Sequence, residues 1–101
     1  MTLRLCYTQK AVTDLDNIYD FIASGNPLRA ETYIEDIKKA CRSLCETPLI
    51  GVNRADLGPD VRILPLWRRI VIAYQVLPDC VHVLRVLSGG QDYEAIMGNG
   101  P

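Results

Sequence analysis

The sequence predicts a single small α+β domain in which a helical hairpin packs on one face of a mostly antiparallel sheet. Two amphipathic helical patterns follow a short strand pattern, with almost no residues between them. Three further strand patterns follow with short connections, so the predicted order is β-α-α-β-β-β. A chain of 101 residues is long enough to bury one such core.

The first half of the chain contains the signals for the hairpin. Residues 3–7 alternate like a strand, and Thr8 is a suitable N-cap for a helix over residues 9–24. We expect Gly25 to end this helix in a left-handed conformation. The apolar face of the helix recurs at spacings of four, three and four residues and comprises Ala11, Leu15, Ile18 and Ile22.

A second helix begins immediately, because Asn26 can cap it and Pro27 suits its first position. It is predicted to reach Glu46, before Thr47-Pro48 stops it. Its stripe comprises Ala30, Ile34, Ile37, Cys41 and Leu44. So short a junction predicts an antiparallel hairpin, and we expect Ile18, Ile37, Ile72 and Val86 to be buried together beneath it.

The second half contains strand patterns over residues 61–66, 69–76 and 81–88. Pro78-Asp79 forms the turn between the last two, which makes them antiparallel neighbours. We expect residues 1–97 to form the domain and residues 98–101 to form a flexible tail.

Strand alternation predicts an apolar sheet face opposite the helices. It would carry Val71, Val83 and Leu87 beside Arg69 and Arg85. An uncovered apolar surface edged by arginine usually marks a site for a protein partner. The alternative is that the segment 91–97 folds over this face, although seven residues can hide only part of it.

Trp67, Arg68 and Arg69 fall in a turn between two strands, where glycine or asparagine would be usual. An exposed tryptophan beside two arginines has the composition of an interface anchor. An equally weighted alternative is that Trp67 folds back over the helical hairpin and the two arginines lie in solvent.

Composition narrows the functional classes. The formal net charge of −1 and the sequence pI of 5.7 lack the basic excess of proteins that bind nucleic acid through phosphates. No apolar run reaches the roughly 20 residues of a membrane span, and no signal segment precedes the first strand, so we expect a cytoplasmic protein. The four cysteines lack zinc-site spacing, and we expect no metal, no disulfide, and Cys41 facing the core.

Several short motifs, taken in order, resemble the RelE/ParE toxin superfamily and its ParE-type members in particular. They span about ninety residues: Ala11-x-x-Asp14-Leu15-x-x-Ile18-x-x-Phe21-Ile22, Asn26-Pro27-x-x-Ala30, Leu44-x-x-x-Pro48-x-x-Gly51-x-x-Arg54, Asp56-Leu57-Gly58-Pro59 and Leu84-Arg85-Val86-Leu87-x-Gly89. The resemblance implies the toxin of a type II toxin–antitoxin system. ParE-like toxins are implied to act on DNA gyrase and to be silenced by a ParD-type antitoxin, whereas RelE-like toxins cut messenger RNA on the ribosome.

The residues favour an inhibitor over a nuclease. Cleavage of RNA needs clustered basic groups and a general acid or base. At the positions of Ser88 and Gln91 the superfamily often has histidine and arginine, and both are neutral here. Arg62, Arg68, Arg69 and Arg85, with Tyr93 as a conceivable acid, form an incomplete set.

We therefore expect no catalytic residue, no cofactor, no direct nucleic-acid binding and no membrane partner. The alternatives are a ribosome-dependent mRNA endoribonuclease, or a degenerate relative that binds the antitoxin and acts only in autoregulation. The residues predicted to bind the antitoxin or the target are Arg62, Trp67, Arg68, Arg69, Arg85, Gln91, Asp92 and Tyr93.

Overall fold

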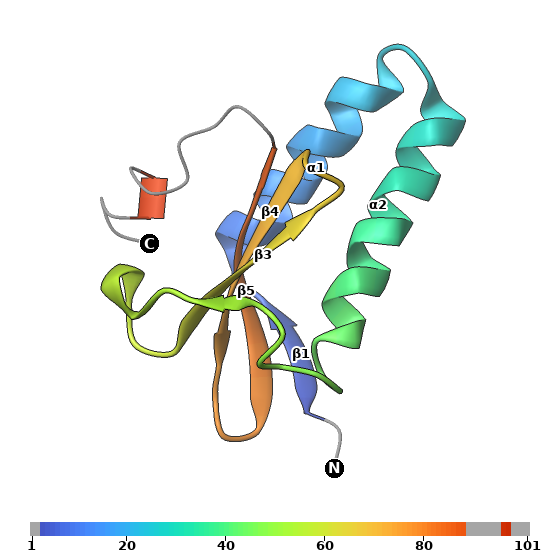
Figure 1. The fold of residues 1–101 in the computed structure, drawn as a ribbon. Helices are drawn as coiled ribbons and strands as arrows, with labels where there is room; N and C mark the ends of the chain where they lie inside the picture. Colours follow the sequence, from blue (N-terminus) through green and yellow to red (C-terminus); the bar gives the residue numbers. More distant parts are fainter. Residues whose placement is uncertain (1–2, 89–95, 98–101) are drawn as a thin grey trace.

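The computed structural model describes residues 3–88 and 96–97 of the chain. Its elements are β1 (Arg4–Tyr7), α1 (Gln9–Ala23), α2 (Pro27–Ser43), β2 (Val52–Asn53), the 3-10 helix η1 (Ala55–Leu57), β3 (Val61–Leu66), β4 (Ile70–Val76) and β5 (Cys80–Ser88). The predicted α+β class is confirmed, because the helical hairpin packs on a mostly antiparallel sheet (Figure 1). The predicted boundary between a domain of residues 1–97 and a tail stays a prediction, since residues 98–101 lie outside the described part.

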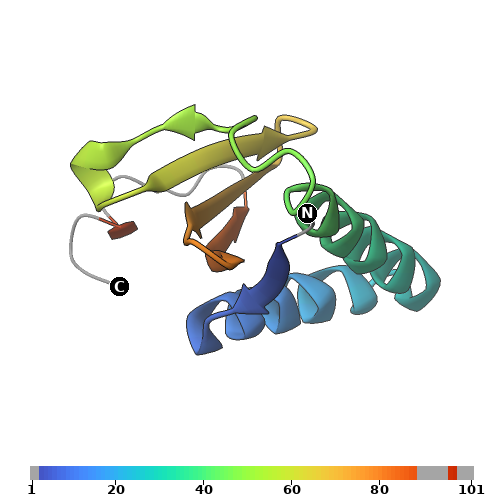
Figure 2. The ribbon, with the colours of Figure 1, turned by 90° about the horizontal axis from the view of Figure 1, so that it is seen from below.

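The sheet has five strands in the order β1-β5-β4-β3-β2. β1 runs parallel to β5, and every other pair is antiparallel. The helical hairpin connects β1, at one edge of the sheet, to β2, at the other edge. β1 lies beside the helices (Figure 2). The sequence did not predict β2, because its two residues are too few to show alternation.

Both helix starts agree with the sequence. The Thr8 hydroxyl accepts a hydrogen bond from the Ala11 N–H at 3.0 Å, and the Asn26 side chain accepts one from the Arg29 N–H at 3.1 Å. These bonds satisfy N–H groups that a helix start otherwise leaves without partners. The first turn of each helix is thus fixed by a residue that the sequence identifies.

Two predicted helix ends are wrong. α2 ends at Ser43 rather than Glu46, because the Leu44 N–H donates to the Cys41 carbonyl and tightens the last turn. Gly25 does not have a left-handed backbone, since Gly58 is the glycine with positive φ among the described residues. Instead the N–H groups of Gly25 and Asn26 both donate to the Ile22 carbonyl, at 3.0 and 2.8 Å.

The main core lies between the hairpin and the sheet. Ile37, Ile72 and Val86 are almost fully buried in it, as predicted, whereas Ile18 is only partly buried and packs against it. Cys41 is also fully buried there, as predicted.

A bulge in β5 changes the predicted alternation of its side chains. Ala73 of β4 lies opposite Arg85, whereas Tyr74 lies opposite Val83, so Leu84 is an extra residue in β5. An extra residue reverses the alternation beyond it. Val83 and Val86 therefore both join the core under the helices, and the prediction that Val83 lies on the opposite face is wrong.

The opposite sheet face has a second, smaller core. Ile63 and Ala73 are buried there with Met97, and Leu57, Val71 and Leu84 pack around them. Met97 is 7% exposed, and the segment at residues 96–97 lies well apart from α2 in Figure 1. The expectation of an uncovered face is thus wrong here, because Met97 from the C-terminal segment packs against it.

Candidate functional site

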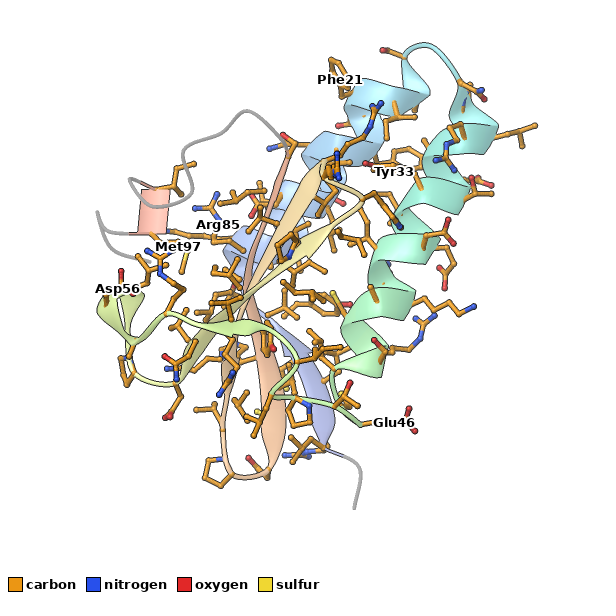
Figure 3. All side chains as sticks on the ribbon, in the orientation of Figure 1. Phe21, Tyr33, Glu46, Asp56, Arg85 and Met97 are labelled. Carbon is orange, nitrogen blue, oxygen red and sulfur yellow. The ribbon has the colours of Figure 1, made fainter. Side chains whose placement is uncertain are left out.

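An open groove of about 910 Å³ lies between the hairpin, the β3–β4 turn and the end of β5. Its apolar lining comes from α1, β4 and β5 and includes Ile18, Ile22, Ile70 and Val86. Phe21 and Tyr33 stand along it, and Phe21 is 83% exposed (Figure 3). A phenylalanine so exposed at the side of an apolar groove is typical of a contact surface for another molecule.

Three arginines line this groove, which we call the basic groove: Arg29 from α2, and Arg68 and Arg69 from the β3–β4 turn. Within the described part of the chain, none of them makes an ion pair. Asp14 also lines the groove, but its charge is compensated by Arg85. The groove therefore combines an apolar lining with a local positive charge in a protein whose net charge is −1.

The β3–β4 turn that supplies two of these arginines has an unusual backbone. Trp67 and Arg68 have φ angles of 55° and 59°, in the left-handed region, and the Arg69 N–H donates to the Leu66 carbonyl at 3.1 Å. Residues other than glycine, asparagine and aspartate seldom adopt this conformation, which costs on the order of 1–2 kcal/mol for each residue. A short hairpin turn between antiparallel strands favours positive φ at both central residues, so the β3–β4 pairing accounts for this backbone.

Trp67 is both packed and accessible. Its ring centroid lies 5.2 Å from that of Tyr33, with the planes tilted by 52°. The Arg29 guanidinium stands 5.0 Å from the centroid of the Tyr33 ring. Trp67 does fold back towards the hairpin, as one alternative predicted, yet it stays 47% exposed and extends the aromatic edge of the basic groove.

Arg85 was predicted to bind a partner, and the structure shows its guanidinium in an ion pair with Asp14. Its Nε and Nη2 groups donate to the two Asp14 carboxylate oxygens at 2.8 and 2.9 Å, and this bonding raises the pKa of the Arg85 guanidinium. The same carboxylate accepts a hydrogen bond from the Val86 N–H at 3.0 Å. With side chains only 18% and 11% exposed, Arg85 and Asp14 join β5 to α1.

Arg62 also has a structural role. Its Nη1 group donates to the carbonyls of Leu49 and Gly51, at 3.2 and 2.7 Å. The Tyr74 hydroxyl donates to the Pro48 carbonyl at 2.7 Å and accepts from the Gly51 N–H at 2.9 Å. The loop at residues 48–51 is thus held in place by β3 and β4.

The predicted site residues therefore separate into three groups. Arg68 and Arg69 line the basic groove and Trp67 contacts its Tyr33, whereas Arg62 and Arg85 make hydrogen bonds that hold the fold. Gln91, Asp92 and Tyr93 lie outside the described residues. The sequence reasoning missed Phe21, Arg29 and Tyr33, although a phenylalanine beside rather than within the apolar stripe of α1 was an available signal for Phe21.

Neither a metal site nor a membrane span is found in the described part of the chain. No group of three histidine, cysteine or acidic side chains there could hold an ion. No helix among these residues has the length and apolar character to cross a bilayer. All four cysteines are free thiols.

The fold and the basic groove together define a small α+β domain with an open, partly apolar groove that three arginines line. Residues 5–93 match the family described as the ParE toxin of the type II toxin–antitoxin system, parDE. The chain therefore belongs to the ParE toxin family.

Two similar proteins agree with this assignment. The toxin RelE2 of Caulobacter vibrioides is 30% identical over 83 residues, which cover 82% of this chain and 91% of that protein. The solved chromosomal ParDE toxin–antitoxin system from P. aeruginosa contains a chain with a TM-score of 0.74 and 29% identity. That similarity covers 87% of this chain and 97% of the other.

Proposed function

We propose that this toxin inhibits DNA gyrase by binding it, and that a ParD-type antitoxin neutralises the toxin by occupying the basic groove. The observation that carries the proposal is the basic groove of a ParE-family chain, with an apolar lining, an aromatic edge and three arginines that make no ion pair in the described part. Because gyrase is cytoplasmic, we expect the toxin to act in the cytoplasm.

The chemistry of the groove indicates the kind of antitoxin segment that fits it. Apolar side chains of the segment would extend the lining at Ile18 and Ile70, and carboxylates would face Arg68 and Arg69. Such local complementarity selects partners and speeds their association even when the net charge of a protein is small. The segment is therefore expected to be acidic and amphipathic.

Binding rather than catalysis is supported by the groups that line the groove. Asp14 is engaged by Arg85, and the single histidine of the chain, His82, is not among the lining residues. A ribonuclease would need a general acid or base within reach of its substrate. These features favour a protein inhibitor over the endoribonuclease alternative.

The target can be tested with two assays of the purified toxin. We expect it to block DNA supercoiling by gyrase and to leave ribosomal translation intact. Cleavage of messenger RNA on the ribosome without an effect on supercoiling would establish the alternative that the name of the Caulobacter relative suggests. Loss of both effects, with antitoxin binding retained, would indicate the degenerate relative with an autoregulatory role.

The antitoxin site can be tested by calorimetric titration of arginine variants. Arg69→Ala should cost about 2–5 kcal/mol of affinity if its guanidinium is desolvated in the complex. Arg4→Ala is the matched control, because the Arg4 side chain is 80% exposed and lies in β1, outside the groove. Equal affinities for both variants would place the antitoxin elsewhere.

A further inference from the structure

A second groove lies on a different face of the helical hairpin. It has a volume of about 550 Å³ and shares no lining residue with the basic groove. We call it the acidic groove, and its lining residues from β1, α1 and α2 are Tyr7, Val12, Leu15, Asp16, Tyr19, Glu31, Ile34, Glu35 and Lys38.

The apolar part of the acidic groove is continuous with the main core. Leu15 is 6% exposed and belongs to that core, and Tyr7 and Ile34 pack against it. Val12 remains 39% exposed. An apolar side chain of a partner placed here would continue an existing core instead of covering an isolated surface residue.

The charged part of the acidic groove has the opposite sign to the basic groove. Asp16, Glu31 and Glu35 are the acidic lining residues and Lys38 is the basic one, while Arg42, outside the lining, pairs with Glu35. Within the described residues, Asp16 and Glu31 make no ion pair and no side-chain hydrogen bond, and Glu35 bonds Arg42 in an exposed pair. The Asp16 and Glu31 carboxylates are therefore available to cations of another molecule.

We infer that the acidic groove binds a basic amphipathic helix of a partner protein. Its apolar side chains would lie on Leu15, Val12 and Ile34, and its lysines or arginines would face Asp16, Glu31 and Glu35. Two helices side by side offer the surface on which a third helix packs. The inference goes beyond the proposed antitoxin contact, because an acidic antitoxin segment would be repelled here.

A synthetic helix of about 15 residues, built from leucine and lysine, is a direct probe. Its binding to the full chain is measured by fluorescence anisotropy and located by amide chemical shifts. We expect the peptide to shift the amide resonances of Val12 and Ile34. The double variant Glu31→Lys with Glu35→Lys should bind the peptide at least about tenfold more weakly than the wild type, since its new lysines repel those of the peptide. A peptide with glutamate in place of lysine should not shift these amides.

The matched control reverses two exposed charges outside the groove, Asp20→Lys with Asp36→Lys, and gives the same change in net charge. It should bind the lysine peptide nearly as wild type. Equal weakening by both double variants would overturn the inference, because the attraction would then reflect net charge.

Two further results would also overturn it. One is a dimer of the free toxin that Glu31→Lys with Glu35→Lys dissociates, since a second copy would then cover the groove. The other is displacement of the lysine peptide by saturating antitoxin, since the groove would then belong to the antitoxin interface. Neither readout uses gyrase, so a failure here is distinct from a failure of the proposed target.

Discussion

Arginine has two different roles in this protein, and the nearest partners of each side chain decide which. Arg68 and Arg69 line the basic groove without an ion pair in the described structure. Arg62 instead donates hydrogen bonds to backbone carbonyls, and Arg85 pairs with a carboxylate. The sequence indicated the first pair, because an exposed turn leaves few structural partners. It could not show that Arg85 meets Asp14, a residue 71 positions away.

The Asp14–Arg85 pair should be important for stability. Arg85→Ala leaves the Asp14 carboxylate mostly buried with one remaining bond, from the Val86 N–H, and should lower the free energy of unfolding by about 2–4 kcal/mol. Urea melts measure this loss. Arg42→Ala, which breaks an exposed ion pair with Glu35, should cost less than about 1 kcal/mol. Equal losses in the two variants would show that burial adds nothing to the Asp14–Arg85 pair.

The Cys41 thiol should be protected in the folded protein. Burial raises its pKa from 9.0 to about 11, so it is neutral at pH 8, while Cys6 is exposed. Iodoacetamide, which reacts with thiolates, should label Cys6 first and Cys41 only after unfolding.

The contribution of the buried Cys41 thiol to the free energy of unfolding is complete below pH 9 and is lost as the pH rises through about 11. Peptide mass spectrometry tests the labelling, and modification of Cys41 as fast as Cys6 would contradict its burial.

At the scale of elements, local signals were sufficient for the helices and insufficient for the sheet edges. Thr8 and Asn26 act within three residues of their own positions, so both caps could be read from the sequence. The bulge at Leu84 and the strand β2 depend on pairing with other strands. The alternation of side chains along one strand does not show where a bulge inserts an extra residue. The sequence therefore assigned Val83 to the wrong face of the sheet.

The packing of α2 gives a prediction with an internal control. Ile37 is fully buried in the main core, whereas Ile50, in the loop held by Arg62 and Tyr74, is 63% exposed. Ile37→Ala should lower the free energy of unfolding by about 2–5 kcal/mol, through lost burial and a cavity. Ile50→Ala should change it by less than about 0.5 kcal/mol. A loss of that small size for Ile37→Ala would show that α2 does not pack as described.

At the scale of the whole molecule, the distribution of charge matters more than its sum. The composition argued against nucleic acid as the main ligand, and the net charge of −1 is indeed small. The fold nevertheless gathers three arginines at one groove and three carboxylates at another. No property of the sequence averaged over its length could have predicted this separation, because α1 and α2 each contribute to both grooves.

The response of antitoxin association to salt distinguishes local from net charge. If net charge governed the encounter, an acidic antitoxin would be repelled, and screening by salt would speed association. If the basic groove governs it, salt should slow association, by roughly tenfold between about 50 and about 500 mM NaCl. Stopped-flow measurements give this rate directly.

The double variant Arg68→Ala with Arg69→Ala should flatten the dependence of the association rate on salt. Arg4→Ala with Arg42→Ala removes the same charge outside the groove and should retain the wild-type slope. Flattening by both double variants would assign the attraction to the molecule as a whole, and association that accelerates with salt would remove the basic groove from the encounter.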